Sequence, residues 1–201
     1  LPSLDNKKVL VFMGEQKYLS EEESKVIDYF CECYNTVVLC DQTSGYKGKY
    51  RVLSALLASQ ECQKYKPLYT CDILFHVGGI SGDYYTMGAI KASEVWRVDE
   101  DGEIRDKFKK LTAVFEMSFN QFLHYYSKSQ SKNTNSLIEE FRNANESLAN
   151  RIPELPFSNI WIASQLSKRI PDNSVVHLGI LNSLRAWNFF ETKETVRTYS
   201  N

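Results

Sequence analysis

The stretch Lys8-Val9-Leu10-Val11-Phe12-Met13-Gly14 decides the fold, because it is a short apolar run that ends abruptly at a glycine. A run without alternation of polar and apolar residues is typical of a strand buried on both faces. A helix is expected next, since Ser20 and Glu23 have the spacing of a capping box and Ile27 and Phe30 begin a helical apolar repeat. A buried strand followed by such a helix indicates the first unit of a parallel sheet.

The same alternation repeats along the chain. Further strands are expected at residues 36–40, 72–77, 94–98 and 112–115. Further helices are expected at residues 83–91 and 119–126, and around the apolar positions Val52, Leu53, Leu56 and Leu57. Repeated strand-helix-strand units connect parallel strands by right-handed crossovers. The sequence therefore predicts the α/β class, with a Rossmann-like parallel sheet flanked by helices.

A change of composition marks a boundary after this region. Residues 127–136 contain no large apolar side chain and consist mainly of Ser, Lys, Asn and Thr, which indicates a linker or a solvated connection. Ser136 and Glu139 then have the spacing of a second capping box. The pattern predicts a helix after Ser136, a further helix at 159–169, and strands at 175–178 and 195–200. We expect a central domain over 1–127, a linker and helix over 128–157, and the truncated beginning of another domain over 158–201.

Composition excludes several classes of protein. With 43% hydrophobic and 24% charged residues among 201, the chain is expected to fold. A formal net charge of -1 supplies no basic surface for nucleic acid. No apolar stretch approaches the ~20 residues of a membrane span. Most of the five cysteines lie in or beside apolar runs and are expected to be reduced core residues, which indicates a soluble cytoplasmic protein.

Two turns are candidates for binding phosphate. The turn at residues 14–17 lacks the glycines of a dinucleotide fingerprint. The turn Gly78-Gly79-Ile80-Ser81-Gly82 is a better candidate for binding an anion than residues 14–17, because its backbone N–H groups could face the anion. Asp83 follows at once, and its carboxylate would cap the same donors and repel the anion. Both interpretations stay open, and the plain tight turn is favoured.

The cysteines and histidines offer no recognisable catalytic arrangement. Cys31 and Cys33 are expected inside a helix, where residues two apart point to different sides, so both are interpreted as core residues. No Ser or Cys elbow accompanies His76, His124 or His177, which are interpreted as hydrogen-bonded structural histidines. No catalytic residue, cofactor-binding residue or metal ligand is therefore assigned.

The segment Asn182-Ser183-Leu184-Arg185 is the candidate binding site. It follows a predicted strand, and it offers an amide, a hydroxyl and a guanidinium, which suit a carboxylated substrate. The alternative is the start of a helix with an exposed arginine, and the residues themselves do not decide between the two.

The order of several short motifs resembles one enzyme family. Asp41 with Ser44-Gly45 is similar to Asp-x-x-Ser-Gly after a second strand, residues 71–79 to a Pro-Asp-hydrophobic-Gly-Gly strand end, and residues 94–99 to a Trp-x-Val-Asp strand. Tyr199-Ser200-Asn201 resembles the residues before a Gly-Ile-Asp-Gly stretch. In this order the motifs resemble the central domain and the start of the C-terminal domain of the SEPHCHC synthase (MenD) family of menaquinone biosynthesis.

The resemblance covers essentially the whole chain and implies a function. Members of the family use thiamine diphosphate and Mg²⁺ to decarboxylate 2-oxoglutarate and add the succinyl unit to isochorismate. The resemblance implies that this chain is one part of such a transferase, inactive alone and without bound cofactor. Its implied partners are the N-terminal and remaining C-terminal domains of the same polypeptide, a homo-oligomer and small-molecule substrates.

Two departures from the family pattern concern the site. The family shows Gly-Asn-Ser-x-x-x-Arg, whose serine and arginine contact substrate. Arg185 keeps the family's distance from Gly179, whereas Asn182 and Ser183 come two positions late. Some members carry a lysine in the turn where Asp83 stands.

Two alternative functions of the chain stay open. It could be a free-standing Rossmann-type nucleotide-binding module, or the central domain of an acetolactate-synthase-type enzyme.

Overall fold

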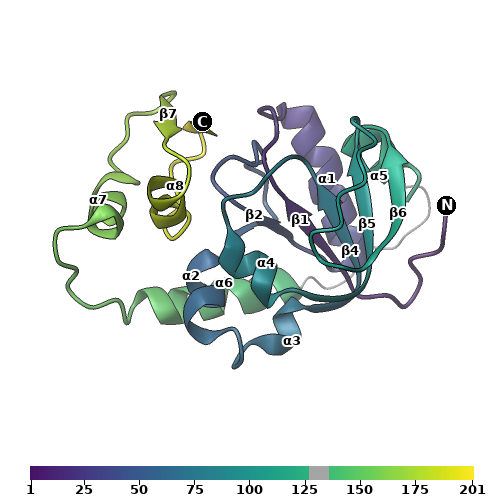
Figure 1. Ribbon diagram of the computed structural model, residues 1–201, viewed down its shortest axis with the longest axis horizontal. Coiled ribbons are helices and arrows are strands. Elements are labelled where there is room, and N and C mark those ends of the chain that lie inside the picture. The colour runs from purple at the N-terminus through teal and green to yellow at the C-terminus, as the bar shows by residue number, and fades with distance from the viewer. Residues whose placement is uncertain (127–135) are drawn as a thin grey trace.

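A six-stranded parallel sheet forms the larger part of the molecule (Figure 1). The structure, a computed structural model, describes residues 1–126 and 136–201. The strands lie in the order β3-β2-β1-β4-β5-β6. Their bounds are β1 (Val9–Met13), β2 (Val38–Cys40), β3 (Arg51–Leu53), β4 (Thr70–Val77), β5 (Lys91–Asp99) and β6 (Leu111–Glu116). The predicted α/β class and Rossmann-like parallel sheet are confirmed.

Helices cover both faces of this sheet (Figure 1). On one face lie α1 (Glu21–Tyr34) and α5 (Phe119–His124), where Phe30 and Phe122 place their rings 5.8 and 5.0 Å from the ring of Phe75 in β4. On the other lie α2 (Ala55–Glu61), α3 (Lys66–Tyr69), α4 (Tyr84–Ala89) and α6 (Ser136–Ala149). Every residue of β1 is buried between these layers, as a strand covered on both faces requires.

One predicted helix is wrong at its beginning. Val52 and Leu53 lie in β3, which pairs with β2 through Leu39 opposite Val52, and α2 starts only at Ala55. The apolar positions at 52, 53, 56 and 57 happen to match a helical repeat, but the first two fill the edge of the sheet. The strand predicted as third is consequently β4.

The two predicted capping boxes have different outcomes. At α1, Ser20 N donates to Glu23 Oε2 at 2.7 Å and Glu23 N donates to Ser20 Oγ at 3.2 Å, which confirms the first box. The second is wrong, because Ser136 is already the first residue of α6. Leu137 N donates instead to the side-chain oxygen of Asn35, at 3.2 Å, so the end of α1 caps the start of α6.

A smaller unit follows α6 and has its own core. It consists of α7 (Asn159–Leu166), β7 (Val175–Leu178), α8 (Asn182–Trp187) and β8 (Arg197–Ser200), with β7 and β8 paired in parallel. Its core contains Ala163, Leu178, Leu184, Ala186 and Trp187. Helix α6, predicted as a connection, packs on the main sheet and contributes Phe141 to the large core. Most of the predicted linker, residues 127–135, lies outside the described residues.

Candidate functional site

Open α/β sheets bind ligands at the carboxyl ends of their strands, and here that edge is bridged by a buried aspartate. Asp41, directly after β2, accepts hydrogen bonds at Oδ2 from Ser81 Oγ at 2.8 Å and from Gly82 N at 2.9 Å. Its Oδ1 accepts from both the backbone N and the Oγ1 of Thr43, each at 2.7 Å. The side chain is fully buried. A carboxylate of the protein itself thus holds the glycine turn after β4.

The use of these donors within the protein disfavours the interpretation of residues 78–82 as an anion cradle and favours the plain tight turn. Gly79 N donates to the carbonyl of Glu15 at 2.8 Å, so it is also used internally. Asp83 caps α4 as expected, accepting from Thr86 N at 2.9 Å. Burial raises the pKa of Asp83 to about 6, and its Oδ2 has no hydrogen-bond partner in the described part of the chain.

A fully buried arginine fixes the neighbouring loop. Arg97 in β5 donates to the carbonyl oxygens of Gly78 at 2.9 Å and Glu103 at 3.0 Å. It also pairs with Asp101 at 2.9 Å and Asp99 at 3.3 Å. Sequence reasoning missed this residue, although a lone arginine between Trp96 and Val98 in a buried strand is a signal that it needs buried partners.

A crevice of about 290 Å³ remains between the ends of β1, β4 and β5. It lies where the strand order reverses, which is the usual ligand position in such sheets. Its lining combines apolar strand ends with side chains of both charges, including Met13, Lys17, Glu23, Asp99 and Asn120. No sequence motif predicted this crevice, and its mixed charge does not select one ligand chemistry.

The predicted site in the smaller unit brings Arg185 and Asn182 together. Both line a pocket of about 370 Å³ at the start of α8, which they share with Tyr85 and Phe189. Ser183 is half-buried and is absent from the described residues that line this pocket. The geometry therefore favours Asn182 and Arg185 over Ser183 as binding residues.

Part of the guanidinium of Arg185 has no hydrogen-bond partner among the described residues. Its Cζ lies 4.9 Å from the ring centroid of Tyr84 in α4, a cation–π arrangement that orients the group. Its Nε is buried and makes no hydrogen bond to any described residue. Leu181, just before α8, has φ 77° and ψ -111°, an unusual backbone conformation of the kind that accompanies binding sites. An oriented guanidinium beside an amide suits a carboxylate or phosphate.

The histidines differ from their prediction. His76 is buried, but its Nδ1 has no partner among the described residues, and burial and the nearby Arg97 lower its pKa to about 4. His124 and His177 are exposed, and His177 stacks on Tyr199 with ring centroids 5.7 Å apart. The interpretation of Cys31 and Cys33 as core residues is confirmed, because both are buried in α1 and neither forms a disulfide. In the described ranges, no three His, Cys, Asp or Glu residues form a group that could hold a metal ion.

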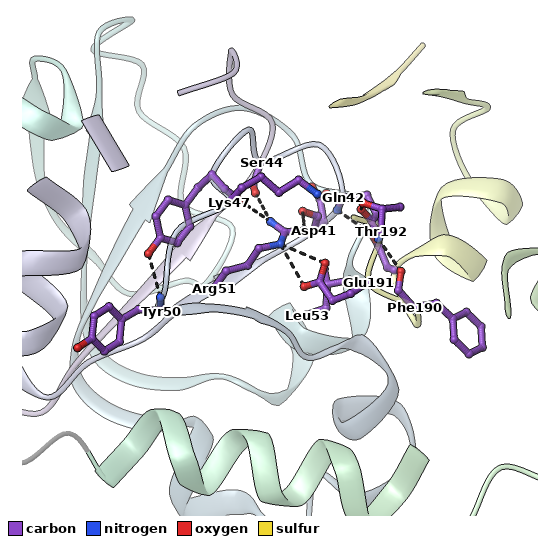
Figure 2. Close-up of polar contacts among 12 residues, drawn as sticks. Asp41, Gln42, Ser44, Lys47, Tyr50, Arg51, Leu53, Phe190, Glu191 and Thr192 are labelled. Atoms are coloured by element: carbon purple, nitrogen blue, oxygen red, sulfur yellow. Dashed lines mark hydrogen bonds and ion pairs between the residues drawn. The ribbon is translucent and has the colours of Figure 1, made fainter. Parts of the chain in front are cut away.

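Polar contacts join the smaller unit to the carboxyl edge of the main sheet (Figure 2). The side-chain amide of Gln42 donates to the carbonyls of Trp187 at 3.1 Å and Phe190 at 2.7 Å, and its backbone N donates to Asn188 Oδ1 at 2.9 Å. Arg51 pairs with Glu191 at 3.1 Å. The pocket of Arg185 also has lining residues from both units, because Tyr85 of α4 lines it together with residues of the smaller unit.

No protein-family model matches the chain, and no curated protein does. Within the described residues, no helix has the length and apolar character that a membrane crossing requires. The fold is thus established by the structure itself, and the resemblance to SEPHCHC synthases stays a prediction.

Proposed function

We propose that this chain is part of a thiamine-diphosphate-dependent carboligase of the SEPHCHC synthase type, and that Arg185 binds a substrate carboxylate in it. The observation that carries the proposal is the guanidinium of Arg185, whose buried Nε is unpartnered among the described residues and which lines a pocket with Asn182. A buried donor without an acceptor destabilises the folded protein unless a ligand accepts its hydrogen bond. 2-Oxoglutarate and isochorismate both carry carboxylates that match this donor set.

The described residues do not fit the cofactor itself. They contain no group of acidic or other ligands for Mg²⁺, and the glycine turn after β4 already donates to Asp41 and Glu15. We therefore assign the cofactor to the other domains of the same polypeptide, within a cytoplasmic homo-oligomer, and derive no step through it. The same use of turn donors disfavours the alternative of a nucleotide-binding module at residues 78–82.

The test is isochorismate-dependent release of carbon dioxide from 2-oxoglutarate by the polypeptide that includes the flanking domains, with thiamine diphosphate and Mg²⁺. Arg185→Ala is expected to lower kcat/KM about 100-fold, because one charged partner of a desolvated carboxylate is lost. Arg185→Lys should recover part of this loss, since lysine keeps the charge without the bidentate geometry. Arg169→Ala, at an exposed arginine of the same unit, is the matched control. An intact protein that releases no carbon dioxide under these conditions would refute the assignment.

A further inference from the structure

Basic side chains from three separate parts of the chain meet beside β3. They line a depression of about 670 Å³ between the main sheet, α6 and the smaller unit. We call it the cationic groove, and its basic members are Lys47, Lys49, Arg51, Arg142, Lys168 and Lys193. Against these six cations, the lining contains two carboxylates, Glu191 and Glu194. The remaining described lining residues are Gly48 and Thr192, so none of the described residues that line the groove is aromatic or aliphatic.

Part of this positive charge is neutralised within the protein. Glu191 accepts from Arg51 Nε at both carboxylate oxygens, at 3.1 and 3.3 Å (Figure 2). Outside the lining, Asp172 pairs with Lys193 at 3.3 Å and Glu139 pairs with Arg142 at 2.8 Å. Among the described residues, Lys47, Lys49 and Lys168 form no ion pair, although Glu191 lies close enough to attract Lys47.

Lys47 is the most constrained of those lysines. It is half-buried, and its Nζ donates to Thr192 Oγ1 at 3.0 Å (Figure 2). No carboxylate of the described residues forms an ion pair with it. Burial, followed by the charge of Arg51, lowers the pKa of Lys47 to about 8. Lys168 is exposed and also makes no ion pair to a described residue. A bound anion would give both ammonium groups the ion-pair partner that they lack among the described residues.

We propose that the cationic groove binds a compact polyanion of the diphosphate class. The ammonium groups of Lys47, Lys49 and Lys168 match the oxygens of a diphosphate. The guanidinium of Arg51 contributes charge alone, because it already donates to Glu191, to Ser44 and to two carbonyl oxygens. The absence of apolar and aromatic groups from the described lining disfavours a ligand held by an aromatic ring. The groove shares no lining residue with the Arg185 pocket, so this proposal does not depend on the proposed enzyme function.

The test is titration of the 201-residue chain with sodium pyrophosphate in a calorimeter at low ionic strength. Lys168→Gln is expected to weaken binding about tenfold, through the loss of one unpaired cation. This lysine is exposed, so its replacement should leave the fold intact. Lys107→Gln, at an exposed lysine on the loop after β5, is the matched control and should leave the affinity unchanged.

A second variant and a second anion test the proposal further. Lys47→Met is expected to abolish binding, and circular dichroism shows whether this variant is folded; Lys168→Gln decides the case if it is not. Citrate carries a similar charge on carboxylates, and we expect it to bind at least about fivefold more weakly than pyrophosphate. Three results would overturn the proposal: no binding at about 1 mM pyrophosphate, equal weakening by Lys107→Gln and Lys168→Gln, or tighter binding of citrate.

Discussion

The Oδ2 of Asp41 accepts a hydrogen bond of 2.8 Å from Ser81 Oγ, and this bond links the end of β2 to the turn after β4 across the end of β1. Asp41→Ala removes the acceptor and leaves the donors of Ser81, Gly82 and Thr43 without it. We expect a loss of about 2–4 kcal/mol in the free energy of unfolding, measured by urea denaturation.

Asp106 provides the control for this change. Its carboxylate accepts from two backbone N–H groups, of Lys110 and Leu111, but the residue is exposed, so water can replace it. Asp106→Ala should cost about 1 kcal/mol or less. Equal losses in the two variants would show that burial does not increase the contribution of the Asp41 contacts to the free energy of unfolding.

Asp83→Asn is expected to stabilise the protein at neutral pH. The pKa of Asp83 is raised from 3.8 to about 6, mainly by burial, so between these values the folded state holds the proton more tightly than the unfolded chain. Stability therefore falls as pH rises through this window and is constant above it. Asparagine keeps the acceptor for Thr86 N without the charge, and should gain about 1–3 kcal/mol at pH 8 and little near pH 4. Thermal denaturation at both pH values measures the difference, and a gain that is independent of pH would contradict the assignment.

The opposite dependence on pH is expected from His76. Its pKa is lowered from 6.5 to about 4, first by burial, so the unfolded chain binds the proton more readily in this range. The contribution of neutral His76 to stability is complete above pH 6.5. It is lost as pH falls toward 4, by up to about 3 kcal/mol. His76→Leu should remove this part of the acid sensitivity, whereas His124→Gln, at an exposed helix position, should leave it in place. Denaturation curves at pH 7 and pH 4.5 distinguish the three proteins.

Two glycines should respond to alanine with opposite signs. Gly78 has φ 80°, and a Cβ there would lie 2.6 Å from the carbonyl oxygen of Glu15, so Gly78→Ala should destabilise the fold by about 2 kcal/mol. Gly88 lies in α4 with open space around its position, so Gly88→Ala should stabilise the protein by about 0.5–1 kcal/mol. Melting temperatures of both variants check the pair, and a shift of the same sign in both would contradict it.

The elements that were predictable from the sequence depend on local patterns. The apolar run of β1 and the Ser20–Glu23 box of α1 each specify their structure within a few residues, and the structure has both. β3 was missed because its three residues are too short to show alternation, and pairing with β2 decides their conformation.

The site could be predicted only in part for a related reason. Arg185 and Asn182 are close in sequence and share a helix, so their proximity followed from their spacing. The closing of the glycine turn depends on Asp41, forty residues earlier in the chain than Ser81. The ring of Tyr84 beneath Arg185 is likewise supplied by a distant element. Partners of this kind are set by tertiary packing, which local spacing does not encode.

The contacts of Gln42 have a consequence for the order of folding. This residue holds Trp187, Asn188 and Phe190, so each hydrogen bond closes a loop of more than 140 residues. The entropy lost in closing such a loop cannot be recovered until the main sheet exists. We therefore expect the smaller unit to attach late in folding, and the amide protons of α8 to exchange with solvent through partial openings that leave β1 and β4 protected.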